Sequence, residues 1–207
     1  MKNEFEIKNG ILIKYNGTET EVVIPNTVTE IGEEAFQLHS NVEKVTIPDG
    51  VTKIGMGAFY DCSNLKEIII PDTVTEIDDY VFCYCTNLTK IKLPKSLKSI
   101  GLSAFERCKS LTDIEIPDGI TEIKSSTFYQ CLNLRNVKLS ENTEKIGGYA
   151  FANCIALNNI NIPVRVQRIN QYAFRNCINL EKVKLSKNIE CAGNTFYLCH
   201  NLKIEIV

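Results

Sequence analysis

The chain of 207 residues contains no tryptophan, only two histidines and no long apolar run. A helix that spans a bilayer needs ~20 consecutive apolar residues, so the sequence predicts no transmembrane segment. Residues 1–8 contain no apolar stretch of the signal-peptide type, so we expect no secretion signal in them. An excess of positive charge is also missing, because the net charge is −2. Proteins that bind nucleic acid electrostatically are usually strongly basic, so this class is disfavoured.

Phenylalanine, by contrast, recurs at a fixed spacing. Eight of the nine phenylalanines follow one another at steps of 23 residues, with a last step of 22, and only Phe5 lies outside the series. The eight are Phe36, Phe59, Phe82, Phe105, Phe128, Phe151, Phe174 and Phe196. Self-similarity at a period of ~20–50 residues is typical of solenoids, and we expect these rings to stack in one buried column.

Other residue types repeat in phase with the phenylalanines. From Pro25 onward most units begin with a proline, which ends the strand before it. Two apolar residues three apart follow, and then a helical turn around the phenylalanine. Each unit closes on alternating apolar residues such as Ile68 and Ile70, which indicates a strand with one buried face. We therefore predict an α/β solenoid of eight ~23-residue repeats over residues 25–207.

Residues 1–24 do not carry this repeat. Asn-Gly pairs at Asn9 and Asn16 separate short runs of alternating apolar residues. This is the pattern of hairpin turns, because both central residues must adopt positive φ. The ends of a solenoid have to cover its core, so we interpret residues 1–24 as an N-terminal β-hairpin cap. We expect its last strand to be in register with Val45 and Ile47.

A cysteine stands three residues after the phenylalanine in seven of the eight units. The seven are Cys62, Cys85, Cys108, Cys131, Cys154, Cys177 and Cys199. We expect free, buried thiols that pack as small apolar residues, since the paired CxxC motifs of zinc sites are missing. Cys83 and Cys191 lie off the column and are expected to label readily. We place Cys191 at the position that Lys53 holds in another unit, and expect it to be exposed.

The repeated columns resemble the leucine-rich repeats of the BspA-like, or Treponema pallidum type, family. The resemblance covers residues 25–207, and the last unit departs from it because it is one residue short. It implies a right-handed arc with a parallel β-sheet on its concave wall. It also implies an interaction protein, since many bacterial members are secreted or surface-exposed and some are adhesins.

The location that the thiols favour differs from the one that the resemblance implies. Nine cysteines cannot all pair internally because the number is odd. Many free thiols suit a reducing compartment, so the cytoplasm is expected from the residues alone. Secretion or the cell surface is the alternative.

Nothing in the sequence favours catalysis. The two histidines, His39 and His200, fall in the first and last repeats, ~34 Å apart at ~4.8 Å per coil. No phosphate-binding loop or nucleophile-elbow motif occurs. We therefore expect no enzymatic activity, no cofactor and no metal site.

The outward strand residues predict a binding face instead. Their charges alternate in sign from strand to strand, beginning with Lys44 and Glu67, and such pairs stabilise a sheet by ~0.2–1 kcal/mol each. Sheet stabilisation alone is one explanation of this face. The other is a protein-binding wall with Ile69 as an exposed apolar anchor, in which specificity lies where the alternation ends. That region comprises Arg135, Asn136, Lys138, Asn158, Asn159, Asn161, Lys182 and Lys184.

Two further surfaces remain open. Residues 204–207 read as a strand with an unpaired edge, so self-association end to end is the alternative function. Six tyrosines flank the phenylalanines, and we favour packing over binding for them: Tyr60, Tyr80, Tyr129, Tyr149, Tyr172 and Tyr197. The outward strand columns contain no aromatic residue, which disfavours sugar stacking on that face.

Overall fold

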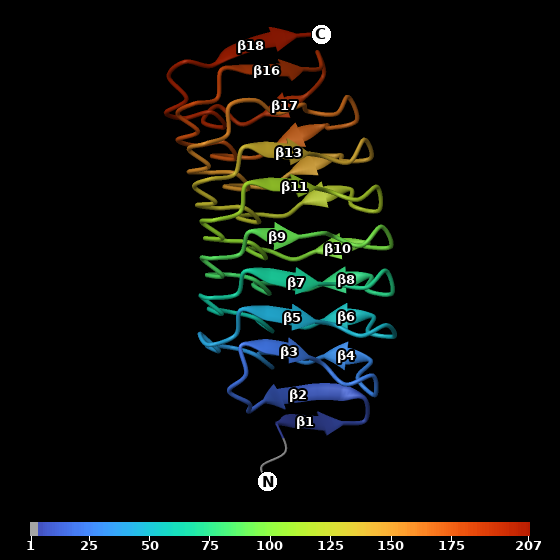
Figure 1. Cartoon of the computed structure of the whole chain (residues 1–207). Helices are drawn as coiled ribbons and strands as arrows, with labels where there is room; N and C mark the ends of the chain where they lie inside the picture. Colours follow the sequence, from blue (N-terminus) through green and yellow to red (C-terminus); the bar gives the residue numbers. More distant parts are fainter. Residues whose placement is uncertain (1–3) are drawn as a thin grey trace.

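Most coils of the chain contribute two short strands that stack on those of their neighbours (Figure 1). The computed structural model describes residues 4–207, which form a β-solenoid of about nine turns with ~23-residue repeats. The first-sheet strands are β3 (Glu21–Val23), β5 (Lys44–Thr46), β7 (Glu67–Ile69), β9 (Lys90–Ile91), β11 (Asp113–Glu115), β13 (Asn136–Lys138), β16 (Lys182–Leu185) and β18 (Lys203–Ile206). The second-sheet strands are β2 (Ile11–Tyr15), β4 (Glu30–Ile31), β6 (Lys53–Ile54), β8 (Glu76–Ile77), β10 (Ser99–Ile100), β12 (Glu122–Ile123), β14 (Lys145–Ile146), β15 (Arg168–Ile169) and β17 (Glu190–Cys191).

Neighbouring coils pair in parallel. In the first sheet Val22 pairs with Val45, as predicted, and Val45 pairs with Ile68. The second sheet was not predicted, and its strands are mostly two residues long, with Ile31 opposite Ile54. One buried isoleucine beside one polar residue is too short a run for the period of two to be recognised.

No α-helix occurs in residues 4–207, so the predicted helical turn and the α/β class are wrong. The segment around each phenylalanine is a pair of turns. The residues two before and two after the ring have positive φ in every coil but the last, for example 59° at Tyr80 and 64° at Tyr84 around Phe82. A residue with a side chain pays ~1–2 kcal/mol for this left-handed conformation.

Hydrogen bonds between coils explain why these turns form. The backbone N–H groups of Tyr80, Phe82 and Tyr84 donate to carbonyls of the next coil over 2.8–2.9 Å. With the left-handed residues at Tyr80 and Tyr84, every second N–H group of the turn points along the solenoid, as in a parallel sheet. A helix would have turned these groups onto its own backbone.

The predicted phenylalanine column is present. Neighbouring rings lie 4.9–5.6 Å apart with interplanar angles of 6–21°. The first seven rings are fully buried, and Phe196 in the last coil is partly buried. This column is the central part of the hydrophobic core.

The cysteine column binds neighbouring coils together. Cys108 Sγ donates to the Phe82 carbonyl oxygen over 3.2 Å, and the same contact recurs along the column at 3.0–3.2 Å. All nine thiols are free, six of the seven column members are buried, and Cys199 is partly buried. Burial raises the pKa of Cys62 to about 12. A small residue with a weak donor therefore suits this position.

Two predictions about the remaining cysteines need correction. Cys83 is only 2% exposed, and burial raises its pKa to about 12, so it is not a readily labelled thiol. Cys191 is exposed, as expected, but it pairs with Ile169 and so takes an inward isoleucine position. The last unit is one residue short, which shifts its register. Counting in strict 23-residue steps therefore placed Cys191 one position away from where it lies.

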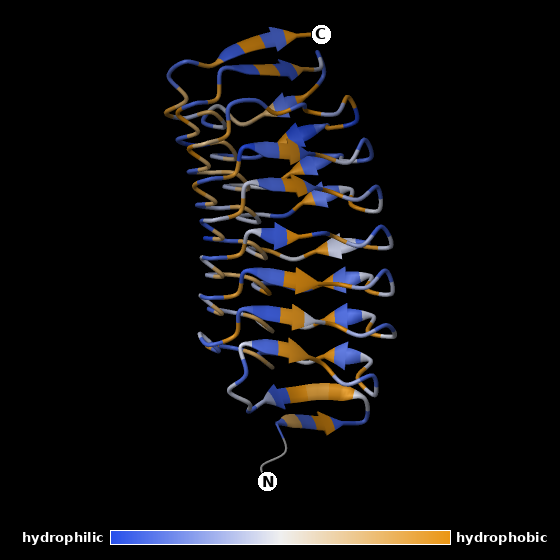
Figure 2. Ribbon diagram, viewed as in Figure 1, coloured by the Kyte–Doolittle hydropathy of each residue, from blue (hydrophilic) through white to orange (hydrophobic). Residues whose placement is uncertain are grey.

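At the N-terminus, β1 (Phe5–Lys8) pairs antiparallel with β2, and β2 pairs in parallel with β4. The first three residues of the predicted cap lie outside the described range. Tyr15 stacks on Phe36 with 4.9 Å between ring centroids, and Phe5 lies 5.2 Å from Tyr15. Figure 2 shows β2 as the most continuously hydrophobic strand near this end. The cap thus extends the aromatic column by two rings.

Both sheets are interrupted near the middle of the solenoid. In the first sheet β9 and β11 are not paired, and in the second sheet β10 and β12 are not paired. Thr89 N–H donates to the Lys66 carbonyl, but residues 4–207 show no equivalent bond from Thr112 to Thr89. The turns stay linked there, since Arg107 N–H donates to the Tyr129 carbonyl over 2.7 Å. Within the described range, no helix has the length and hydrophobicity to cross a membrane.

Candidate partner-binding face

The predicted binding residues project from the first sheet in three successive coils. All eight are exposed, namely Arg135, Asn136, Lys138, Asn158, Asn159, Asn161, Lys182 and Lys184. An isolated parallel bridge joins Asn159 to Lys182, where a full ladder is missing between β13 and β16. The structure therefore places these residues along one face.

Several of these side chains have polar partners. Lys138 Nζ lies 2.6 Å from Glu115 Oε1, and the Asn136 amide donates to Asp113. Hydrogen bonds from Thr112 and Asn136 lower the pKa of the Asp113 carboxyl. The pairing of charged and polar groups thus extends further along the face than the sequence indicated.

The sequence showed no acid beside Lys182 and Lys184 in their own columns of outward residues, but the structure places one there. Lys184 stands opposite Glu205 in the β16–β18 pair, and Lys182 Nζ lies 2.7 Å from Glu205 Oε2. The hydrogen bond from Lys182 and the charges of both lysines lower the pKa of Glu205. The 23-residue period did not reveal this acid, because Glu205 stands opposite Lys184 at a spacing of 21 residues in the shortened last unit.

Two adjacent hollows indent the same face nearer its middle. The first has a volume of about 620 Å³, and its lining includes Ile69 and Ile91. The second has a volume of about 680 Å³, and its lining includes Lys92, Glu115 and Lys138. They meet at β9, beside the interruption of the sheet. Sequence reasoning missed them because hollows arise from the way coils stack and not from a residue pattern.

Lysines at the hollows lack the pairing seen elsewhere on the face. Lys44 Nζ lies 3.3 Å from Glu67, whereas none of the ion pairs within residues 4–207 involves Lys90 or Lys92. Both lysines are exposed. Ile69 beside them is 44% exposed. The hollows therefore combine exposed apolar surface at Ile69 with two lysines outside any ion pair and with acids such as Glu67 and Asp113.

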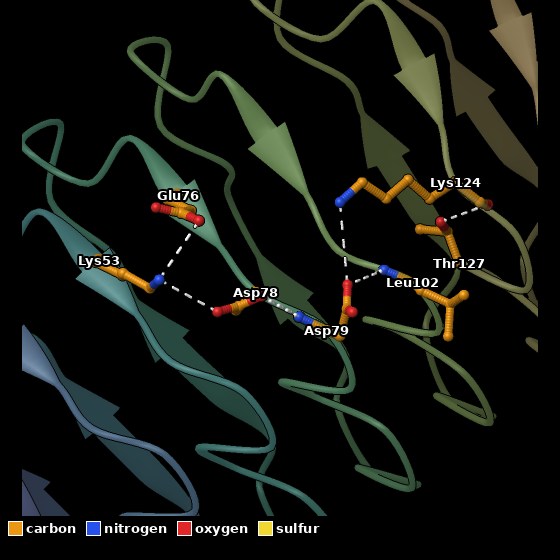
Figure 3. A network of polar contacts seen from close by, with 7 residues as sticks. All are labelled: Lys53, Glu76, Asp78, Asp79, Leu102, Lys124 and Thr127. Carbon is orange, nitrogen blue, oxygen red and sulfur yellow. Dashed lines mark hydrogen bonds and ion pairs between the residues drawn. The ribbon is translucent and has the colours of Figure 1, made fainter.

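The second sheet carries a polar network that spans several coils (Figure 3). Lys53 Nζ lies 3.5 Å from Glu76 and 3.3 Å from Asp78. Asp79 accepts a hydrogen bond from the Leu102 backbone N–H over 2.7 Å, and its carboxylate lies 4.0 Å from Lys124 Nζ. The Asp79–Lys124 contact crosses the interruption between β10 and β12. These charges satisfy one another, which favours a structural role.

The turn flank carries the tyrosines. Tyr60 and Tyr84 are 5.7 Å apart, and the Arg107 guanidinium lies 4.7 Å from the Tyr84 ring centroid. A second group of tyrosines follows in the later coils. Most of these rings are half-buried, so the predicted packing role remains open. Within residues 4–207, no three side chains of His, Cys, Asp or Glu converge as metal ligands would.

The coil geometry and the spacing of its columns agree with a known repeat family. The family described as BspA type leucine rich repeat region matches residues 13–135 and 121–206. The chain belongs to this family. Proteins with these repeats are typically not enzymes. No curated protein matches the chain.

Solved structures include several neighbours of this BspA-type chain. A leucine rich cell surface protein from Faecalibacterium prausnitzii has 26% identity and a TM-score of 0.68, with 95% of this chain and 72% of that one covered. The T. pallidum leucine rich repeat protein has 28% identity and a TM-score of 0.66, with 93% and 82% covered. The pneumococcal vaccine antigen PcpA, at 21% identity and a TM-score of 0.51, is similar in fold over 90% of this chain and 62% of its own.

Proposed function

We propose that this BspA-type chain is a non-enzymatic protein-binding scaffold and that its partner lies across the first-sheet face. The observation that carries this proposal is the pair of hollows around β9, with exposed Ile69 beside Lys90 and Lys92, two lysines that form no ion pair within residues 4–207. Interfaces commonly seat an apolar anchor in such a depression and surround it with polar contacts. The similarity to a bacterial cell surface protein supports a partner outside the cell.

In this proposal the asparagine-rich segment supplies specificity next to the hollows. Asn159 and Asn161 are exposed, and an amide both donates and accepts hydrogen bonds. Asn159 Nδ2 already donates to the side-chain oxygen Oδ1 of Asn158 over 2.8 Å, whereas residues 4–207 offer no such contact to Asn161. Lys138, Lys182 and their acids form the charged rim of the site.

The test begins with partner capture on immobilised protein from two sources, a host-cell surface extract and a bacterial envelope extract. Affinity for the captured partner is then measured for Ile69→Asp, Asn159→Ala, Asn161→Ala and Lys184→Ala. We expect losses of about tenfold or more, ~1.4 kcal/mol, at the residues that dominate the interface.

Lys145→Ala is the matched control. Lys145 forms an exposed ion pair with Glu122 at 2.7 Å, but on the second sheet. Its substitution should leave affinity unchanged. Equal losses in the control and the four variants, or no loss in the four, would contradict binding at the first-sheet face.

Self-association is the second candidate, favoured by the exposed apolar side chains of β18. Ile204 is 48% exposed and Ile206 is 57% exposed. Unpaired apolar strand edges promote pairing between chains. Sedimentation at rising concentration tests this candidate. A mass that rises for the unmodified chain and stays monomeric for Ile206→Lys would support it, and a monomer at all concentrations would reject it.

A further inference from the structure

The turn flank changes its chemistry halfway along the solenoid. We define it as the residues from three before to four after each columnar phenylalanine. In the first four coils this flank carries acids, including Asp61, Asp79 and Glu106. In the last four coils, residues 125–132, 148–155, 171–178 and 193–200 contain no acid and a single arginine, Arg175. Tyrosine and amide side chains replace the charges there.

Four tyrosines form a continuous row over these four coils. We call Tyr129, Tyr149, Tyr172 and Tyr197 the tyrosine row. Consecutive ring centroids lie 6.4, 5.1 and 6.2 Å apart. Tyr197 is 52% exposed and the other three are half-buried. The row therefore follows the solenoid axis without interruption and remains open to solvent.

The rings at the two ends of the row are turned relative to the pair between them. Tyr149 and Tyr172 stack on each other at 27°, whereas Tyr129 stands at 89° to Tyr149 and Tyr197 at 83° to Tyr172. In such an edge contact, at least one face of each end ring is not covered by the pair. Free aromatic faces are the surfaces on which a flat ligand stacks.

A line of amides runs beside the row. Gln130, Asn153 and Asn176 are half-buried and stand at the left-handed position two residues after the phenylalanine, with φ of 57–61°. Asn176 Nδ2 donates to Asn153 Oδ1 over 2.8 Å, and Gln130 Nε2 to the Tyr129 hydroxyl over 3.3 Å. Within residues 4–207, Asn153 Nδ2 and Asn176 Oδ1 have no hydrogen-bond partner, which leaves one donor and one acceptor for a ligand. The backbone ladder holds both at fixed spacing, which lowers the entropy cost of binding.

We propose that the tyrosine row and its amides bind an uncharged glycan chain. The apolar face of a pyranose ring packs on an aromatic ring, while its hydroxyl groups need both donors and acceptors, which amides supply. A nucleic-acid strand also stacks on aromatic rings but requires a cationic groove, and Arg175 is the only such charge on this part of the flank. An extended glycan also fits the shape of the site, which is a line of repeated groups.

The test uses isothermal titration calorimetry with five neutral hexasaccharides: cellohexaose, laminarihexaose, xylohexaose, mannohexaose and maltohexaose. We expect at least one to bind with a dissociation constant in the millimolar range or below. Tyr129→Ala and Tyr197→Ala should each weaken that binding at least tenfold. Asn153→Asp, which replaces the unpaired Nδ2 donor with a carboxylate oxygen and places a charge on the amide line, should also weaken it.

Tyr60→Ala is the matched control, because Tyr60 holds the same position relative to its phenylalanine as Tyr129 and Tyr197 but lies among charged residues. The Tyr60→Ala variant should bind the hexasaccharide with unchanged affinity. Thermal melting followed by circular dichroism checks that all variants fold. The proposal is overturned if no hexasaccharide binds at millimolar concentration, if the Tyr129 and Tyr197 variants bind normally, or if Tyr60→Ala loses as much. Binding of a decaproline peptide to the row in place of every glycan would likewise overturn it.

Discussion

Removing a phenylalanine ring from the middle of the column should destabilise the protein severely, whereas removing the ring at its C-terminal end should have a mild effect. Phe105 is fully buried and stacks on Phe82 and Phe128 at 5.3 and 5.4 Å. Truncating a buried phenylalanine to alanine costs about 3–5 kcal/mol through lost burial and the cavity that remains. Two aromatic contacts vanish as well, each worth about 0.5–1.5 kcal/mol, so we expect Phe105→Ala to fall in the upper part of that range.

Phe196→Ala provides the comparison within the same chain. Phe196 is partly buried and has one stacked phenylalanine, Phe174 at 5.3 Å. Phe196→Ala should lower the free energy of unfolding by at most about half as much as Phe105→Ala does, because water already reaches this site. Urea unfolding followed by circular dichroism and tyrosine fluorescence measures both, because the chain has no tryptophan. A cost below ~1 kcal/mol for Phe105→Ala, or equal costs for the two variants, would refute the account of the core.

Two other predictions test the thiols and the turns. At pH 8 a disulfide reagent should label Cys191 quickly and Cys199 more slowly. Cys83 should react only after unfolding, because a pKa of about 12 leaves it as a thiol at that pH; rapid labelling of Cys83 would contradict its burial. Ser126→Gly should keep or raise stability by up to ~1 kcal/mol, since its φ is 56°. Ser125→Gly next to it should lower stability by ~0.5–1 kcal/mol in urea unfolding, and a reversed order would contradict the left-handed turn.

The sequence predicted the parts of the fold that depend on inward side chains. Phe82 and Cys85 recur at one period because each must fill the same space in every coil, so their columns were visible without a structure. The register of Val22 with Val45 followed from the same period. One residue is missing before Cys191, so the period no longer gives the register there. For this reason the predicted position of Cys191 in its repeat was wrong.

The turn conformation could not be read from the sequence because a local propensity competed with a non-local hydrogen bond. Alanine before phenylalanine favours a helical turn, as at Ala104. In the structure the Phe105 N–H group donates to the Thr127 carbonyl of the next coil over 2.9 Å. That partner is 22 residues away, and no local pattern identifies it.

The candidate binding surfaces were hard to predict for a related reason. The position two residues before the phenylalanine is glycine at Gly57, serine at Ser126 and tyrosine at Tyr149, and all three adopt positive φ between 56° and 59°. Glycine is the residue that this conformation favours, so the backbone gives no reason for a tyrosine there. Tyr149 must therefore be explained by what its ring contacts. In this structure its aromatic contacts are two other tyrosines of the row, Tyr129 and Tyr172, and the residue is partly open to solvent. The backbone hydrogen bonds between coils stabilise the fold and do not depend on the side chains of the turn flank. The turn flank can therefore carry a binding surface.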